Sequence, residues 1–148
     1  MERDAVVLFA MVLAVSAAAR AEELPFDKAI TPADRTLVMK LLGPMEEVNP
    51  QKDLGIAKMD LNGDGRPDYV VVVNSSFWCG SGGCHTFVYL SQGGEYRSAL
   101  RDPLAQGIAL GPGRTQGVRD LELTLHGEKG TSRWVWDGKA YRRAGGRK

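Results

Sequence analysis

The segment from residue 60 to residue 68, Asp-Leu-Asn-Gly-Asp-Gly-Arg-Pro-Asp, has the residue types and the spacing of a calcium-binding loop. Oxygen-bearing side chains occupy positions 1, 3, 5 and 9, and glycine occupies position 6. Calcium takes six to eight oxygen ligands at about 2.4 Å, and alternate side chains of a tightly curled loop can all point inward. The sequence therefore predicts a bound calcium ion. The predicted ligands, with Arg66 acting through its backbone carbonyl, are Asp60, Asn62, Asp64, Arg66 and Asp68.

One ligand of the usual helix-loop-helix calcium site is missing from this loop. That site has a bidentate glutamate at position 12, where this chain has Val71 inside an expected strand. Water or a distant carboxylate must complete the coordination, and the candidate residues are Asp53, Asp120 and Glu122. The alternative is a turn rich in Asp, Asn and Gly that binds no metal, because turns also favour these residues.

The stretch from residue 58 to residue 71 resembles the calcium loop of the FG-GAP and VCBS repeat families, in which Asp-x-Asn-Gly-Asp-Gly-x-x-Asp leads straight into a β-strand. The resemblance covers about a tenth of the chain and implies a loop that holds calcium. Those families carry several copies around a propeller, whereas this sequence has one copy and no internal period of 20 to 50 residues. We therefore expect the loop without the propeller.

A second distinctive segment is the glycine-rich stretch between Cys79 and Cys84, which follows two aromatic residues. In an oxidising compartment such a close cysteine pair is interpreted first as a disulfide. The segment then forms a rigid hairpin tip, and such a tip is suited to contact an extracytoplasmic protein or a glycan. The residues of this possible contact loop are Phe77, Trp78, Gly80, Ser81, Gly82 and Gly83.

The same segment allows three chemical interpretations. Cys79-x4-Cys84-His85 is similar to the widened haem-attachment spacing of some multihaem cytochromes, with His85 as the axial ligand. Alternatively, one cysteine acts as a nucleophile with His85 or His126 as its base. The glycines around Ser81 partly match the Gly-Asp-Ser-Gly-Gly of chymotrypsin-like proteases, but the aspartate is absent and both histidines follow the serine. The sequence favours the disulfide and a protein without enzymatic activity.

The elements that must position these segments are one helix and several strands. Thr31, Pro32 and Asp34 are start signals for a helix, and Gly43-Pro44 ends it. Apolar runs, alternation and turn residues at Gln92-Gly93-Gly94 and Asp137-Gly138 indicate the strands. The expected strands are residues 69–73, 85–90, 95–100, 121–125, 134–136 and 140–142, with an irregular loop over residues 103–117. This pattern predicts a single α+β domain with one N-terminal helix and a mainly antiparallel β-sheet built as a meander of hairpins.

Composition sets wider limits on function. The chain has 148 residues, of which 43% are hydrophobic, and a formal net charge of +1. An ordinary apolar share at this length predicts one compact domain and argues against both a disordered chain and a membrane-spanning bundle. A net charge this close to zero gives no field that favours nucleic acid as a partner.

The first residues predict export. Residues 5–19 form a nearly unbroken apolar run, and Ala19-Arg20-Ala21 has the small-x-small form that signal peptidase accepts. The run is shorter than the ~20 residues that cross a bilayer, so a cleaved signal is favoured over an anchor. We expect residues 1–21 to be a signal peptide and residues 22–148 to form the mature calcium-loop domain. The mature chain is expected to be periplasmic or secreted, without a membrane span.

Together these features predict an exported, non-enzymatic, calcium-binding interaction module. Its expected partner is an extracytoplasmic protein or a glycan. One alternative is a periplasmic inhibitor or immunity protein against a cell-wall hydrolase, because a rigid loop that enters a cleft suits a protein of this size. Another is a thiol or haem redox protein that uses Cys79, Cys84 and His85.

Overall fold

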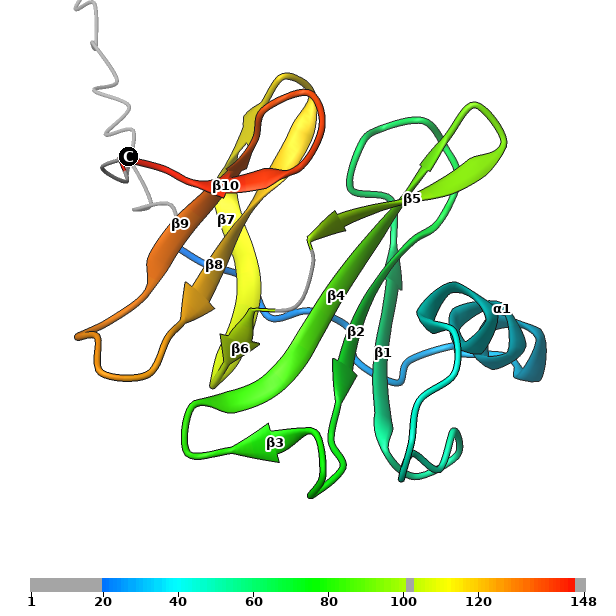
Figure 1. Cartoon of the computed structure of the whole chain (residues 1–148). Helices are drawn as coiled ribbons and strands as arrows, with labels where there is room; N and C mark the ends of the chain where they lie inside the picture. The colour runs from blue at the N-terminus through cyan, green and yellow to red at the C-terminus, as the bar shows by residue number, and fades with distance from the viewer. Residues whose placement is uncertain (1–19, 101–102, 146–148) are drawn as a thin grey trace, which may run out of the picture.

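The computed structural model describes residues 20–100 and 103–145 (Figure 1). The predicted signal peptide, residues 1–21, lies outside the described residues except for Arg20 and Ala21. Within the described residues, no helix has the length and apolar character needed to cross a membrane.

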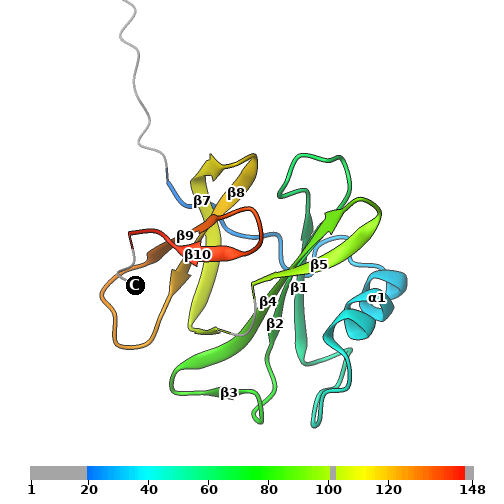
Figure 2. The same cartoon turned by 45° about the horizontal axis from the view of Figure 1, so that its top comes forward.

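One α-helix and two antiparallel sheets make up the described chain, which confirms the predicted α+β class (Figures 1 and 2). The first sheet has the strand order β1-β2-β4-β3, and β5 and β6 also pair with β4. The second sheet has the order β10-β9-β8-β7. The elements are α1 (Pro32–Leu42), β1 (Leu54–Met59), β2 (Asp68–Val73), β3 (Cys79–Gly80), β4 (Gly83–Gln92), β5 (Glu95–Leu100), β6 (Leu104–Ala105), β7 (Gly107–Thr115), β8 (Val118–Thr124), β9 (Ser132–Trp136) and β10 (Tyr141–Arg143).

The strands divide between two sheets because the chain changes partners after Ala105. Ala105 still pairs with Cys84 of β4. The next amide, that of Gln106, already donates to the carbonyl of Thr124 on β8 at 2.8 Å. The chain therefore passes from one sheet to the other without a long loop.

The prediction of an irregular loop over residues 103–117 was wrong, because most of this stretch forms β6 and β7. Its glycines do not break the strand. They make room for Asp120 on the neighbouring strand β8: a Cβ atom at Gly111 would lie 3.1 Å from Asp120 Cβ, and one at Gly113 would lie 3.0 Å from Asp120 Oδ2. The register of β7 on β8 shifts between Leu110 and Arg114, where these glycines lie.

The connection between β9 and β10 also differs from the predicted two-residue turn. It spans residues 137–140, because the Asp137 carboxylate accepts hydrogen bonds from the backbone amides of both Lys139 and Ala140 at 2.8 Å. Strand β1 was not predicted at all. The helix boundaries, by contrast, are confirmed, with Thr31 as the N-cap and Gly43 as the C-cap.

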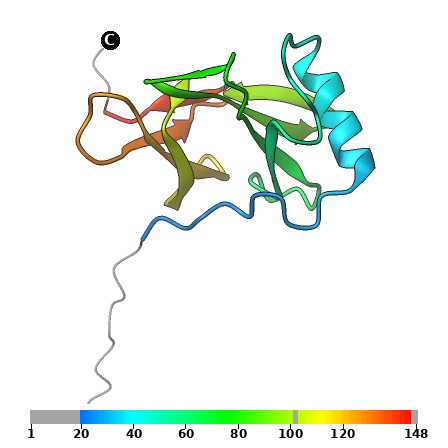
Figure 3. The same ribbon diagram turned by 90° about the horizontal axis from the view of Figure 1, so that it is seen from below.

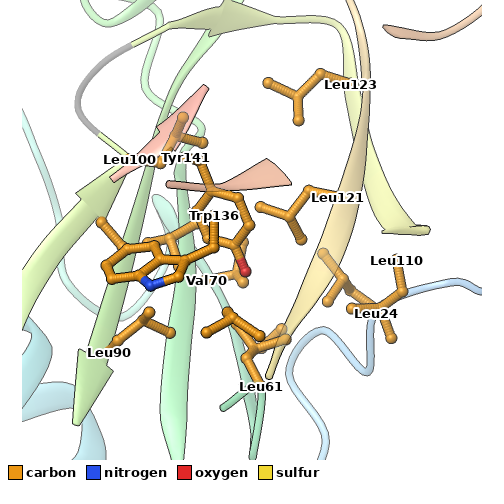
Figure 4. Close-up of a cluster of buried hydrophobic side chains, with 14 of the residues drawn as sticks. Leu24, Leu61, Val70, Leu90, Leu100, Leu110, Leu121, Leu123, Trp136 and Tyr141 are labelled. Atoms are coloured by element: carbon orange, nitrogen blue, oxygen red, sulfur yellow. The ribbon is translucent and has the colours of Figure 1, made fainter. Parts of the chain in front are cut away.

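The first sheet is covered on both faces, which explains why the β-branched run of β2 has no polar alternation. Val71 and Val73 lie in the cluster that packs against α1. Val70 lies in the other cluster, between the two sheets, where it meets Leu121 and Trp136 of the second sheet (Figure 4).

The N-terminal strap, which we define as residues 22–27, connects the two sheets along one side of the molecule (Figure 3). Glu22 forms an isolated bridge with Leu110 of β7, and Phe26 forms one with Ala57 of β1. Strands β7 and β1 are edge strands of their sheets. The strap therefore pairs with backbone groups that would otherwise be unpaired at these edges.

Asp34 fastens the helix to the first sheet. It completes the capping box with Thr31, and its carboxylate also accepts hydrogen bonds from the Tyr69 hydroxyl at 2.6 Å and from Lys58 Nζ at 3.1 Å. Burial by itself raises the pKa of Asp34, but the hydrogen bonds from Tyr69, Thr31 and Lys58 outweigh it and lower this pKa to about 2.

This network predicts a specific loss of stability in acid. A carboxyl group whose folded-state pKa lies below its ordinary value of 3.8 stabilises the fold above that pH, and the contribution disappears as the pH falls through about 2. We expect the free energy of unfolding, measured by urea titration, to fall over this interval. Asp34→Asn is expected to be less stable at neutral pH by about 2 kcal/mol and to show a shallower fall. An equal pH slope in both proteins would contradict this role.

Candidate metal centre

The predicted calcium loop connects β1 to β2, and its ends are held by the last pair of that hairpin, Met59 opposite Asp68. Leu61 is fully buried and anchors the loop in the core between the sheets. Its carbonyl accepts a hydrogen bond from the Arg119 backbone amide at 2.9 Å and one from the Arg114 guanidinium at 3.3 Å. The loop is therefore fixed to the second sheet as well as to the first.

Asp60 holds the loop in its curled form. Its Oδ1 accepts a hydrogen bond from the Gly63 amide at 2.8 Å, and its Oδ2 accepts one from the Gly65 amide at 2.9 Å. Both glycines have a positive φ, of +74° and +80°, which side chains rarely tolerate. The glycines thus allow the bend that turns two amides toward one carboxylate.

Asn62 and Asp64 repeat this arrangement along the loop. The Asn62 Nδ2 donates to the Ser91 carbonyl at 2.7 Å, so Oδ1 is the amide atom turned back toward the loop, where the Asp64 amide lies 3.3 Å away. The Asp64 Oδ1 accepts from the Arg66 amide at 2.8 Å. The Asp64 Oδ2 has no hydrogen bond from the described residues and is available to a ligand.

Asp68 has a different environment from the other loop carboxylates. It is fully buried, and its Oδ2 accepts from the amides of Leu61 at 2.6 Å and Asn62 at 3.3 Å, while its Oδ1 accepts from the Ser91 amide at 2.7 Å. Burial, with a smaller contribution from the charge of Asp64, raises the pKa of Asp68 to about 6 against the opposing effect of these three hydrogen bonds. Asp68 closes the loop and fastens it to β4.

Sequence reasoning missed Ser91, which contacts both Asn62 and Asp68 through its backbone. No residue type marks this role, because any residue supplies a backbone amide and carbonyl. The pairing of β2 with β4 brings Ser91 to the loop, in a register that sets Tyr69 opposite Tyr89. The nearest sequence signal is the turn that begins at Gln92, because this turn ends β4 directly after Ser91.

The residue types of the loop fit calcium, whereas its carboxylates are divided between two tasks. In residues 20–100 and 103–145, no three or more His, Cys, Asp or Glu side chains are grouped so that they could hold one metal ion. The oxygens of Asp60, Asn62 and Asp64 follow the inside of the curl, and those of Asp68 bind backbone amides beneath it. The donor set suited to a hard cation thus consists of these three side chains and the Arg66 carbonyl.

The three carboxylates considered as a further ligand are engaged by other groups. Asp53 Oδ2 accepts from the Asn49 amide at 2.7 Å, ahead of β1 and away from the loop. Asp120 Oδ1 accepts from the Thr115 hydroxyl at 2.7 Å, and Glu122 Oε2 accepts from the Thr131 hydroxyl at 2.5 Å. Water and Asp68 Oδ1, which accepts a single hydrogen bond from the described residues, are the remaining candidates for the open coordination positions.

The second predicted feature is confirmed, because Cys79 and Cys84 form a disulfide. They lie opposite each other in the β3–β4 hairpin, with a Cα–Cα distance of 4.1 Å. His85 packs with its ring 5.2 Å from that of Trp78. The structure thus brings the two sulfurs together, and the ring contact of His85 is with Trp78 rather than with a cysteine. No free cysteine occurs in the described residues, and a disulfide leaves no thiolate for nucleophilic attack.

In the turn directly before β3, the two aromatic residues have different environments. Trp78 is partly buried, and its Nε1 donates to the Glu46 carbonyl at 2.6 Å. Phe77 packs edge-on against Trp78 and is 60% exposed. His126 lies apart from the cysteines in the sequence, and its Nδ1 is 3.3 Å from Gln106 Nε2.

The disulfide predicts a definite result in thiol titration. We expect no reactive thiol in the folded or denatured protein before reduction, and two afterwards. Reduction should lower the free energy of unfolding by about 2 kcal/mol, because the bond closes only a short loop. The double variant Cys79→Ser/Cys84→Ser is the control and should match the reduced protein. Two reactive thiols before reduction would contradict the disulfide and support the thiol nucleophile.

The fold and the loop define the class of this protein as a two-sheet α+β domain with one Asp-x-Asn-Gly-Asp-Gly-x-x-Asp loop. No protein-family model matches the sequence, and neither a curated protein nor a solved structure shows significant similarity to it.

Proposed function

We propose that the protein is an exported, non-enzymatic binding module stabilised by one calcium ion in the loop of residues 60–68. The observation that carries the proposal is the Asp60 carboxylate, which two loop amides hold inside the curl. Asn62 and Asp64 fold back in the same way. A loop of this form brings several oxygen atoms together, and negatively charged oxygens so placed are stabilised by a cation.

The proposed ligands have separate roles. Asp60 and Asp64 supply charge, Asn62 and the Arg66 carbonyl supply neutral oxygens, and water completes the coordination. A carboxylate oxygen has two lone pairs, so Asp68 can offer a further ligand atom while it keeps its backbone hydrogen bonds. When bound, the ion neutralises these carboxylates and crosslinks the loop. The disulfide is compatible with an oxidising, extracytoplasmic location, where calcium reaches the 0.1–1 mM range that such loops require.

Thermal unfolding in EDTA and in calcium tests the proposal. We expect millimolar calcium to stabilise the protein by roughly 1–2 kcal/mol, the value for a ligand present at several times to tens of times its dissociation constant. Asp60→Ala and Asp64→Ala should lose this gain. The surface variant Glu95→Ala, on the neighbouring β4–β5 hairpin, is the matched control and should keep it. A wild-type protein that unfolds at the same temperature in both conditions would reduce the loop to a turn.

A second candidate is the inhibitor of a cell-wall hydrolase, and exposed Phe77 favours it. The side chain lies in the turn before β3, which the neighbouring disulfide and the Trp78 hydrogen bond immobilise, and immobile aromatic residues are frequent anchors in clefts. The protein should then inhibit a lysozyme-type or amidase-type hydrolase in a turbidity assay, and Phe77→Ser should abolish the inhibition. A protein that leaves a panel of such hydrolases fully active would exclude this candidate.

A further inference from the structure

A hollow of about 340 Å³ lies between the two sheets. It is at the end of the β1–β2 hairpin opposite the calcium loop. Gly55 of β1 and Val72 of β2, which pair with each other, line it. Closer to the calcium loop, large side chains such as Leu121 fill the space between the sheets. In the hollow, the small residues Gly55, Ala105 and Gly107 leave part of this space open.

An aromatic ring and an amide meet above Gly55. A Cβ atom on this glycine would lie 3.3 Å from Asn74 Nδ2 and 3.7 Å from Phe26 Cδ1. Phe26 belongs to the N-terminal strap, which is held in place where the Asp27 amide donates to the Ile56 carbonyl at 2.7 Å and the Ile56 amide donates to Asp27 Oδ1 at 3.2 Å. The wall formed by the strap is therefore fixed before any ligand arrives.

The lining of the hollow combines apolar and uncharged polar side chains. Phe26, Val72 and Ile108 are apolar, and Asn74 and Gln106 carry amides. Within the described residues, the Asn74 side chain makes no hydrogen bond. Gln106 uses its Nε2 toward the Ser81 carbonyl at 3.2 Å, and its Oε1 has no hydrogen-bond donor there. Amide groups of this kind both donate and accept hydrogen bonds.

Charge is nearly absent from the lining. Asp27 is the one lining residue with an ionisable side chain, and it already accepts a hydrogen bond from the Ile56 amide and lies 3.8 Å from the Arg35 guanidinium. A wholly apolar ligand would remove the amides and the carboxylate from water without giving them partners. An anionic ligand would meet the Asp27 carboxylate.

We propose that this hollow binds a neutral saccharide, which is the ligand class of the binding module proposed above and rests on that proposal. Its volume lies at the lower end of the roughly 300–1,000 Å³ of small-molecule sites, enough for one or two sugar rings. The C–H face of a ring packs on Phe26 and Ile108. Its hydroxyls, each a donor and an acceptor, bind the amides of Asn74 and Gln106 and the free oxygen of Asp27.

Amide chemical shifts of the 15N-labelled exported protein test the proposal. The probes are glucose, galactose, N-acetylglucosamine, cellobiose and chitobiose, each added to millimolar concentration. At least one is expected to cause saturable shifts at the amides of Gly55, Asn74 and Gly107. Gly55→Val, which fills the hollow, and Asn74→Ala, which removes an exposed amide, should each weaken binding by roughly tenfold or more. Glu95→Ala, at an exposed position on the β4–β5 hairpin and outside the hollow, should bind as wild type does.

Three results would overturn the proposal: no shift with any of the five sugars, shifts confined to the turn around Phe77, or unchanged binding by both Gly55→Val and Asn74→Ala. Repeating the titration with Asp60→Ala in EDTA separates this inference from the calcium proposal. Saccharide binding by a wild-type protein that calcium does not stabilise would contradict the calcium proposal alone. A calcium-dependent gain in stability without any saccharide binding would contradict this inference alone.

Discussion

Asp68→Ala is expected to lower the free energy of unfolding by about 4 kcal/mol in EDTA, because it leaves two buried backbone amides and one partly buried amide without an acceptor. The amides belong to Leu61, Asn62 and Ser91, and the Asp68 side chain is fully buried. Each unsatisfied buried donor costs about 1–3 kcal/mol. Urea unfolding in EDTA measures the loss, and the absence of calcium from the assay ensures that no lost metal ligand contributes to it.

Asp60→Ala is the matched control in the same loop. Its carboxylate also accepts hydrogen bonds from two amides, but those amides are exposed. Because water can take the place of the carboxylate as their acceptor, we expect the free energy of unfolding to fall by only about 1 kcal/mol in EDTA. In millimolar calcium the loss of stability caused by Asp60→Ala should increase, because this variant then also loses the stabilising ion. Equal losses for the two variants in EDTA would mean that Asp68 has no structural role beyond that of its neighbours.

This difference within one loop shows what the sequence could predict and what it could not. The spacing of residues 60–68 predicts alternate oxygen atoms on a curled loop, and Asp60, Asn62 and Asp64 have that arrangement. The same spacing treats Asp68 as an equivalent ligand. Its burial depends on Ser91, which is brought to the loop by strand pairing rather than by any local signal.

The same distinction applies to the fold: elements with local causes could be predicted from the sequence, and elements that depend on distant residues could not. The helix was predicted to within its caps because Thr31, Pro32 and Asp34 act on the backbone within one turn. The stretch of residues 103–117 was misjudged because glycine and proline usually interrupt strands. Here the absence of a Cβ at Gly111 and Gly113 makes room for Asp120, a residue whose position opposite them depends on the tertiary fold.

The hollow between the sheets had no counterpart in the sequence analysis for a related reason. Its lining comes from the strap, from the first hairpin and from the crossover between the sheets, which are distant in sequence. Gly55 lies in an ordinary strand. Nothing in the sequence of that strand shows whether the glycine leaves a cavity beside it or only makes the strand more flexible. Only the position of Phe26 and Asn74 above it makes that distinction.

Gly83→Ala is expected to lower the free energy of unfolding by about 3 kcal/mol or more. This variant tests the structure of the disulfide hairpin, as Asp68→Ala tests that of the calcium loop. Gly83 has a φ of +110°, and a Cβ atom there would lie 2.2 Å from the Ala105 carbonyl oxygen and 2.7 Å from the Gln106 amide nitrogen. Both neighbours are backbone atoms at the crossover between the sheets, so neither can swing aside. Strained dihedrals cost about 1–3 kcal/mol, and overpacking adds a similar amount.

Gly82→Ala separates this backbone constraint from a general need for glycine in the tip. The Cβ of that variant would meet only the side chain of Leu104, at 3.5 Å, an ordinary contact, so the cost should stay below about 1 kcal/mol. Urea unfolding of the two variants, both oxidised, measures the difference. If both variants are mild, the chain can move β3 and β4 away from β6, and the crossover after Ala105 is not rigid. If only Gly83→Ala is severe, the close approach of Gly83 to Ala105 is what fixes the tip beside the hollow and the passage of the chain from one sheet to the other.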